Sequence, residues 1–445
     1  MRVILTVEAG AAIDERYHFD EPESIVIGRD ESARIRVGVS DNLCSRHHCL
    51  LQIDSTNCRI LDLKSRNGTK INGKKTVESE LSHGDLIQVG KTAFRFSIVA
   101  EPPPPLEVDS PPIFDRETTL RPFPDSISAE PATVCLGCSK TIETDSRSKP
   151  DNASPSTICK SCRHSAGAID QKIPGYLLIK KLGAGGMGEV QLALHERTGA
   201  AVALKTILQD IKHEKHYVDR FFREIDVLRE LDHENIVAIF DAGQAERSLY
   251  FAMEYVPGVD SSQWVESRGP LSIDRAVDWT RRMLEGLEYA HAKGFVHRDV
   301  KPANLLIQKT GRGEEVKIAD FGLARTYQSS SLSGLTRPGS TMGTLHYMPP
   351  EQALDCRASK PAVDQFSAAA TLYHWLTGRH IRELPKGFTH QIRCVLTSPA
   401  IPIDTRRANI PRSLSSAIAR ALSLNPLDRF ADVREFRHAL ETFRR

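Results

Sequence analysis

A glycine-rich segment in the middle of the chain has a spacing suited to phosphate chemistry. Glycines at positions 183, 185 and 188 follow an apolar run that is typical of a β-strand. Backbone without side chains can approach phosphates closely, both in loops that cover a nucleotide and in dinucleotide-binding units. A dinucleotide-binding unit continues with a helix, whereas residues 190–194 are a second β-type run. The segment therefore predicts a hairpin over nucleotide phosphates, and a dinucleotide oxidoreductase is the disfavoured alternative.

Four cysteines form two pairs with the spacing of metal ligands. Cys135 and Cys138 make one CxxC pair, Cys159 and Cys162 make the other, and 20 residues lie between the pairs. Four thiolates at this spacing can converge on a tetrahedral, structural zinc ion. The intervening residues are almost all polar, so we expect the metal, not an apolar core, to stabilise the segment. The alternatives are a disordered linker with reactive thiols and a redox site, which lacks the usual βαβ surroundings.

Four more motifs follow the glycines in order. They are Val202-Ala-Leu-Lys205, His297-Arg-Asp-Val-Lys-Pro-Ala-Asn304, Asp320-Phe-Gly322 and Pro349-Pro-Glu351. With the glycines they match the protein-kinase signature set, and residues 175–443 resemble the bacterial, eukaryotic-like Ser/Thr protein kinases. The resemblance implies a two-lobed α+β fold that binds ATP and Mg²⁺ between the lobes. It also implies transfer of the γ-phosphoryl group to Ser or Thr hydroxyls of proteins, including autophosphorylation.

The resemblance assigns the nucleotide contacts to the N-terminal part of this region. Lys205 neutralises the α and β phosphates and is held by Glu224, which lies in an amphipathic run typical of a helix. Met253 is the gatekeeper, and the backbones of Glu254 and Val256 meet the adenine. The remaining implied ATP contacts are Leu182, Gly183, Gly185, Gly186, Gly188, Val190, Ala203 and Leu306.

The catalytic positions follow from the same resemblance. Asp299 accepts the proton of the substrate hydroxyl, and Lys301 stabilises the transferring phosphate, as is usual in Ser/Thr kinases. Asn304 and Asp320 supply oxygen ligands to Mg²⁺. Every position that the chemistry needs is occupied, so a catalytically inactive phosphopeptide-binding scaffold is the alternative that we rank second.

Three features near the catalytic motifs concern regulation and packing. The Ser/Thr-rich interval between Asp320 and Glu351 predicts activation by phosphorylation, with Thr336 and Thr341 as the switch positions. Glu351 is expected to pair with Arg429. The segment that begins at Asp364 departs from the family pattern, with Phe and Ala in place of Trp and Gly, which puts the packing of the local helix in doubt.

The first 99 residues combine short β-type runs with three polar clusters: Gly28-Arg29, Ser45-Arg46-His47-His48, and Arg66-Asn67-Gly68-Thr69. Arginine forks, hydroxyls and amides suit a phosphate, although each cluster alone also fits ordinary turn chemistry. Together they resemble the forkhead-associated (FHA) domain, a β-sandwich that binds phosphothreonine. The resemblance implies phosphate contacts from Arg29, Ser45, Arg46, Arg66 and Asn67.

Composition and length limit the remaining possibilities. The chain has 445 residues, enough for several domains, and its 59 Lys and Arg nearly balance 57 Asp and Glu. This balance argues against a nucleic-acid partner and against attraction to an anionic membrane. Neither a membrane span nor an export signal is expected, and nine cysteines without a disulfide pattern favour the cytoplasm.

The predicted organisation has four parts. We expect an FHA domain at 1–99, a proline-rich linker at 100–134, a zinc ribbon at 135–165 and a kinase domain at 175–443. The kinase domain divides into an N-lobe, 175–256, and a C-lobe, 257–443. The expected partners are Ser/Thr-containing protein substrates and phosphothreonine proteins. The chain's own phosphorylated segments, such as the linker at Thr118 and Thr119, are a further partner for the FHA domain.

Overall fold

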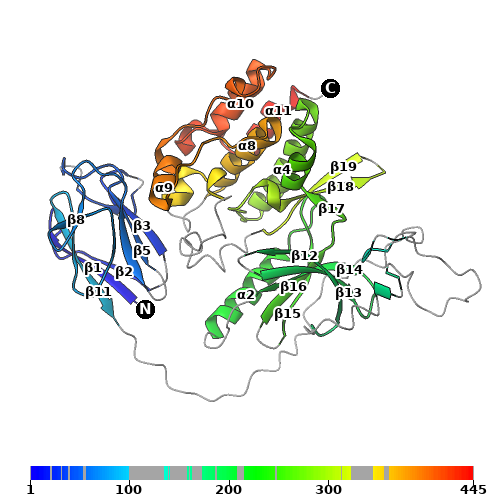
Figure 1. Cartoon of the computed structure of the whole chain (residues 1–445), viewed down its shortest axis with the longest axis horizontal. Coiled ribbons are helices and arrows are strands. Elements are labelled where there is room, and N and C mark those ends of the chain that lie inside the picture. Colours follow the sequence, from blue (N-terminus) through cyan, green and yellow to red (C-terminus); the bar gives the residue numbers. More distant parts are fainter. Residues whose placement is uncertain are drawn as a thin grey trace, which may run out of the picture. The chain divides into compact units, whose positions relative to one another are not determined.

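The structure is a computed structural model, and Figure 1 labels its helices and strands. The chain divides into two compact units. The first unit combines Met1–Ser110, Asp260–Leu305 and Asp320–Arg445, and the second combines Pro111–Val259 and Leu306–Ala319. The described residues are 2–20, 23–31, 33–38, 41–53, 57–99, 135–138, 140, 158–159, 161–162, 173–185, 188–207, 215–245, 248–311, 313–321, 344–354 and 360–443. The predicted linker, Gly186, Thr336 and Thr341 lie outside them.

A β-sandwich forms the N-terminal part of the first unit, as expected. One sheet has the order β2-β1-β11-β10-β7-β8 and the other the order β4-β3-β5-β6-β9. The apolar residues that alternate along the strands meet between the sheets in a core that includes Leu5, Ile25, Leu51 and Phe96. The strands are β1 Arg2–Ala9, β2 Arg16–Phe19, β3 Glu23–Gly28, β4 Ile35–Arg36, β5 Cys49–Ile53, β6 Cys58–Asp62, β7 Thr69–Ile71, β8 Lys74–Thr76, β9 Glu78–Glu80, β10 Leu86–Val89 and β11 Thr92–Val99.

Helices form the C-terminal part of the first unit. Their core includes three tryptophans: the Trp279 ring lies 5.4 Å from the rings of both Trp264 and Trp375, edge-on to each. The long helices α4 and α8 pack side by side (Figure 1). The helices are α3 Ser261–Arg268, α4 Ile273–Ala292, η1 Pro302–Asn304, η2 Thr344–His346, α7 Pro350–Leu354, α8 Ala362–Thr377, α9 Phe388–Thr397, η3 Ile403–Thr405, α10 Arg412–Ala421, η4 Pro426–Asp428 and α11 Val433–Glu441.

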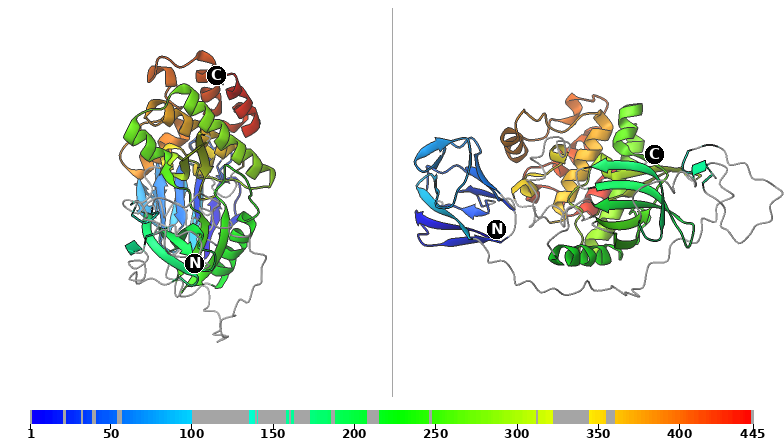
Figure 2. Two further views of the ribbon diagram at one scale, coloured as in Figure 1. Left: turned by 90° about the vertical axis from the view of Figure 1, so that its right-hand side faces the viewer. Right: turned by 60° about the horizontal axis from the view of Figure 1, so that its bottom comes forward.

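The second unit is built on an antiparallel sheet of order β12-β13-β14-β16-β15, with helix α2 along one face (green in Figure 2). The sheet comprises β12 Tyr176–Gly185, β13 Gly188–His195, β14 Ala201–Ile207, β15 Ile239–Ala245 and β16 Ser248–Glu254, and α2 is Lys215–Leu228. A small sheet of β17 Gly258–Asp260, β18 Leu305–Thr310 and β19 Gly313–Ile318 adjoins it. The glycine-rich segment leads into β13 and not into a helix, which rules out the dinucleotide-binding arrangement.

Among the residues that the structure describes, no helix has both the length and the apolar composition needed to cross a membrane.

Candidate active site and phosphate-binding loops

The loop from His297 to Asn304 brings three of the predicted catalytic side chains together in the first unit. Lys301 Nζ lies 2.8 and 3.0 Å from the two carboxylate oxygens of Asp299. Asn304 Nδ2 donates to the Asp299 carbonyl oxygen at 2.8 Å and to its carboxylate at 3.1 Å. The loop therefore holds one carboxylate between a cation and an amide at fixed positions.

A fully buried carboxylate on α8 holds the backbone of this loop. Asp364 accepts the N–H of His297 at 2.8 Å and the N–H of Arg298 at 2.7 Å, and His291 Nε2 lies 2.8 Å from it. Burial alone would raise the pKa of Asp364, but the hydrogen bond and charge of His291, with the charge of His297, hold that pKa below its usual value. Arg298 has φ 68°, a left-handed conformation that costs energy without such support.

Asp320 lies close to the same loop because its neighbour packs there. The Phe321 ring meets the ring of the buried His297 edge-on at 4.6 Å. Asp320 itself has φ 61°. A second left-handed, non-glycine residue beside the loop is typical of a functional site, where surrounding contacts maintain a strained backbone.

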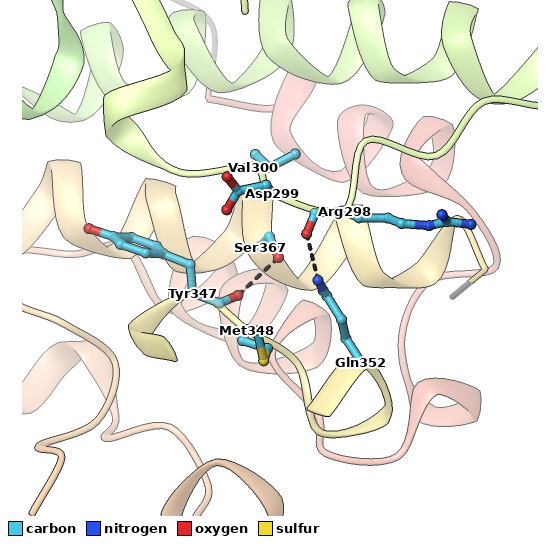
Figure 3. Close-up of a pocket in the computed structure, with 7 residues that line it drawn as sticks. All are labelled: Arg298, Asp299, Val300, Tyr347, Met348, Gln352 and Ser367. Atoms are coloured by element: carbon cyan, nitrogen blue, oxygen red, sulfur yellow. Dashed lines mark hydrogen bonds between the residues drawn. The ribbon is translucent and has the colours of Figure 1, made fainter. Parts of the chain in front are cut away.

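A pocket lined by Asp299 lies between this loop and α7 (Figure 3). Gln352 of α7 donates to the Arg298 carbonyl at 2.6 Å, and Ser367 of α8 donates to the Tyr347 carbonyl at 2.9 Å, as Figure 3 shows. Both side chains are buried. The segment from residue 347 to α7 is therefore tied to the backbone beside the candidate base.

The packing that the sequence left in doubt is intact. Arg429, whose side chain is fully buried, makes the expected ion pair with Glu351, with Nη–Oε distances of 2.6 and 2.9 Å. This bidentate contact confirms the predicted pairing.

The doubt about the packing of the helix that begins near Asp364 was unfounded, because α8 forms and Phe366 and Ala369 are fully buried in it.

Lys205 and Glu224 belong to the second unit. Lys205 lies on β14 between Val190 of β13 and Phe251 of β16, and its Nζ is 6.0 Å from the centre of the Phe251 ring. Glu224 is half-buried on α2, the helix predicted there. The same register places the buried Ala203 opposite the buried Met253.

The strand hairpin before Lys205 depends on a glycine. Gly183 pairs with Val190 and Gly185 with Gly188, so the predicted glycines occupy the end of the β12–β13 hairpin. A Cβ at Gly188 would lie 1.9 Å from the Thr206 carbonyl oxygen, in addition to requiring φ of 149°. This position therefore excludes every residue with a side chain.

The predicted adenine-contacting segment lies at the end of β16. Glu254 pairs with Lys317 at 2.9 Å, and its backbone N–H donates to the Ala238 carbonyl at 2.8 Å. Val256 is buried, Leu306 of β18 is half-buried and Leu182 is exposed. All of these residues belong to the second unit.

The three polar clusters of the sandwich meet in adjoining loops. Ser45 Oγ accepts the backbone N–H of Arg66 at 3.0 Å, and the Arg29 N–H donates to the Ser45 carbonyl at 3.2 Å. Asn67 Nδ2 donates to the Leu43 carbonyl at 2.7 Å, while the side chains of Arg29, Arg46, Arg66 and Asn67 are exposed. Gly28 is essential to this meeting, because a Cβ there would lie 2.0 Å from the Arg46 carbonyl oxygen.

The four cysteines converge in the second unit. Their Sγ atoms all lie within 4.8 Å of one another, with Cys138 and Cys159 3.8 Å apart. Burial opposes ionisation of Cys135, but backbone N–H groups, among them that of Cys159 at 3.1 Å, outweigh it and lower the pKa of Cys135 to about 6. The arrangement suits a tetrahedral thiolate site.

The cluster has apolar contacts that the sequence did not predict. Buried Ile158 and Cys135 share an apolar cluster with Leu194 of β13, against which Leu177 and Ile179 of β12 also pack. The segment therefore packs on an apolar surface, and the strands of the neighbouring sheet provide it. The local sequence is too polar to reveal this partner, which lies elsewhere in the chain.

The protein kinase domain family matches residues 176–441, which is more than half of the chain. The chain belongs to the protein kinase family. The FHA domain family matches residues 25–90 within the sandwich.

The relatives that this chain resembles include bacterial serine/threonine-protein kinases. It is 35% identical to the serine/threonine-protein kinase PknJ of Mycobacterium tuberculosis over 62% of this chain and 46% of that protein. It is 34% identical to Pkn1 of Myxococcus xanthus over 60% of this chain and 38% of that protein. The chain thus spans less than half the length of these relatives. The crystal structure of the M. tuberculosis PknI kinase domain is 28% identical, covers 61% of this chain and 97% of that one, and has a TM-score of 0.47.

Asp364 and Gln352 hold the backbone of the candidate catalytic loop, a role that the sequence did not predict for either of them. Asp364 carries a signal in the sequence: it is a single acidic residue in a helix whose other residues are mostly apolar. A charge that is buried on such a face needs partners, and here these are the backbone N–H groups of the catalytic loop. Gln352 carries no comparable signal.

Proposed function

We propose that this kinase transfers the γ-phosphoryl group of ATP to Ser or Thr hydroxyls of proteins, itself included. The observation that carries the proposal is the arrangement of Lys301 and Asn304 around Asp299. Asp299 orients the substrate hydroxyl and accepts its proton. Lys301 is placed to stabilise negative charge that develops on the phosphoryl group beside this carboxylate.

We assign the metal ligands to residues of the first unit and the phosphate contacts to residues of the second. Asn304 and Asp320 offer the oxygen ligands that Mg²⁺ prefers, and Lys205 offers the cation for the phosphates, with Glu224 as its partner. Mg²⁺ bound to ATP supplies charge neutralisation of the phosphates. We assign the adenine contacts to Ala203, Met253, Glu254, Val256 and Leu306, and the phosphate cover to the glycine hairpin.

No observation favours the inactive scaffold. The lysine, both aspartates and the asparagine that phosphoryl transfer requires are present. Because this chemistry depends on positioning and charge, a chain that retains these groups in order has what the reaction needs.

Replacement of the candidate base tests the activity. We expect Asp299→Asn to lower the rate of phosphoryl transfer from radiolabelled ATP by about 10²–10⁴-fold, the usual contribution of a general base. Asp404→Asn, an exposed residue of η3, is the matched control and should transfer at the wild-type rate. A wild-type protein that transfers no phosphate from Mg·ATP would support the inactive-scaffold alternative. An Asp299→Asn protein with the wild-type rate would show that Asp299 is not the general base.

We further propose that the loops of the FHA sandwich bind phosphothreonine, in other proteins or in phosphorylated segments of this chain. Three exposed arginines in adjoining loops offer charge-assisted hydrogen bonds to a phosphate, and Asn67 and Ser45 add neutral donors. The bonds among these loops fix their shape before a ligand binds, which reduces the entropic cost of binding.

Loss of one loop arginine tests this site. Arg66→Ala should weaken binding of a phosphothreonine peptide about 10–100-fold, which corresponds to a charge-assisted hydrogen bond of about 1.5–3 kcal/mol. The control Arg16→Ala removes an exposed arginine of β2, away from these loops, and should leave the affinity unchanged. Equal affinity for the unphosphorylated peptide would contradict the assignment. The measurement is isothermal titration calorimetry on the full chain.

We infer that Cys135, Cys138, Cys159 and Cys162 bind a structural Zn²⁺. The convergence of four thiols and the N–H groups directed at Cys135 support this inference. Because the cluster packs on Leu194 and Ile179, the metal would stabilise the kinase sheet as well as its own loops.

Metal removal tests the zinc site. The purified chain should contain one Zn²⁺, and Cys138→Ser should lose it and lower the melting temperature of the kinase domain, by about 2–4 °C for each kcal/mol lost. Cys394→Ser is the control, since this cysteine lies outside the cluster. A metal-free wild-type protein with the same melting temperature as Cys138→Ser would refute the inference. Metal analysis and calorimetry provide the two readouts.

A further inference from the structure

The five-stranded sheet of the FHA sandwich has an apolar outer face. Val26 of β3 is the cross-strand neighbour of Leu50 of β5, and Leu50 is the neighbour of Leu61 of β6. Strand neighbours such as Cys49 and Leu51 point into the sandwich core, so these three residues form a row on the opposite side. The outer face of an antiparallel sandwich sheet is usually polar.

This outer row is covered. Val26, Leu50 and Leu61 are 0, 1 and 2% exposed, as fully buried as the core of the sandwich. Ala33 and Leu63 extend the same buried cluster. Ala33 lies four residues after Arg29 and Leu63 three residues before Arg66, so the covered face reaches the phosphate-binding loops.

The residues that cover the row come from the C-lobe, within the same compact unit. Helix α7 contacts β3 directly. The C-lobe members of the cluster are Leu345, Met348, Ala353, Leu354, Ile392, Val395 and Leu396, with Leu384 packed at its edge.

We propose that the FHA domain docks through this outer face onto the α7–α9 surface of its own C-lobe. Two apolar surfaces that meet in one buried cluster gain by exclusion of water, and neither is suited to exposure. The 35 residues of the predicted linker at 100–134 keep the two surfaces on one chain, which gives their contact a high effective concentration. The occupant of the face is therefore this chain and not a second copy.

The docking site is connected to the catalytic loop. Gln352 of α7 donates to the Arg298 carbonyl, so the docked segment is tied to the loop that carries Asp299. The docked cluster also includes Ala33 and Leu63, which lie close in sequence to Arg29 and Arg66, together with Leu345 of η2. The FHA domain is thus a structural part of the region around the catalytic loop as well as a recruitment module.

Hydrogen exchange of the full chain tests the docking. Leu50→Glu places a charge in the centre of the row, and amides of α7 and α9 should then exchange about tenfold faster or more. Val77→Glu makes the same kind of change at a residue that is 70% exposed and should leave these amides as in wild type. Phosphopeptide binding by Leu50→Glu reports that the sandwich is folded. Unchanged exchange in a variant that still binds phosphopeptide would overturn the proposal.

A variant on the opposite surface keeps the test decisive if Leu50→Glu unfolds the sandwich. Leu384→Asp changes a half-buried residue at the edge of the cluster. It should release the FHA domain and increase the radius of gyration in X-ray scattering, with phosphopeptide binding intact. Wild type should stay compact at every protein concentration. An unchanged radius in Leu384→Asp, or a wild-type chain that is extended when monomeric and buries the face only in a dimer, would overturn the proposal.

Discussion

The hydrogen bonds from the candidate catalytic loop to the buried carboxylate of Asp364 are the interaction on which the candidate active site depends. A charge without exposure to water costs several kcal/mol unless hydrogen bonds compensate for it, and two backbone N–H groups and His291 do so here. The bonds also maintain the left-handed backbone of Arg298. Asp299 is the next residue in the chain, so its position depends on a carboxylate that is itself fully buried.

The rest of the first unit supports this loop from several sides. The Arg429–Glu351 ion pair anchors α7, and Gln352 of α7 reaches the loop backbone. Phe321 packs on His297 and so ties Asp320 to the same loop. In the second unit, strand register places Lys205 between Val190 and Phe251, and Gly188 allows the close approach to Thr206. Each functional group is thus fixed by regular structure or by buried polar bonds.

The sequence predicted much of this architecture because the kinase and FHA motifs consist of local residue patterns. The strand after the glycines, the amphipathic helix with Glu224 and the Glu351–Arg429 pair were all predictable. Contacts between distant segments that no family motif marks were not. Ile158 is one apolar residue in a polar segment, and only the fold supplies Leu194 as its neighbour. Likewise, Leu50 fits a sandwich strand whether the outer face of the sheet is exposed to solvent or buried, so the burial of that face could not be predicted from the sequence.

The turnover of Asp364→Asn is the measurement that tests this account most directly. Asn has the shape of Asp but offers one acceptor oxygen where two N–H groups now donate, so the Arg298–Asp299 backbone loses its support. We predict that kcat falls about 100-fold, since small misplacements of a reacting group cost that much. KM for ATP should change little, and calorimetry should show a folded kinase domain. A folded Asp364→Asn protein with wild-type kcat would contradict it.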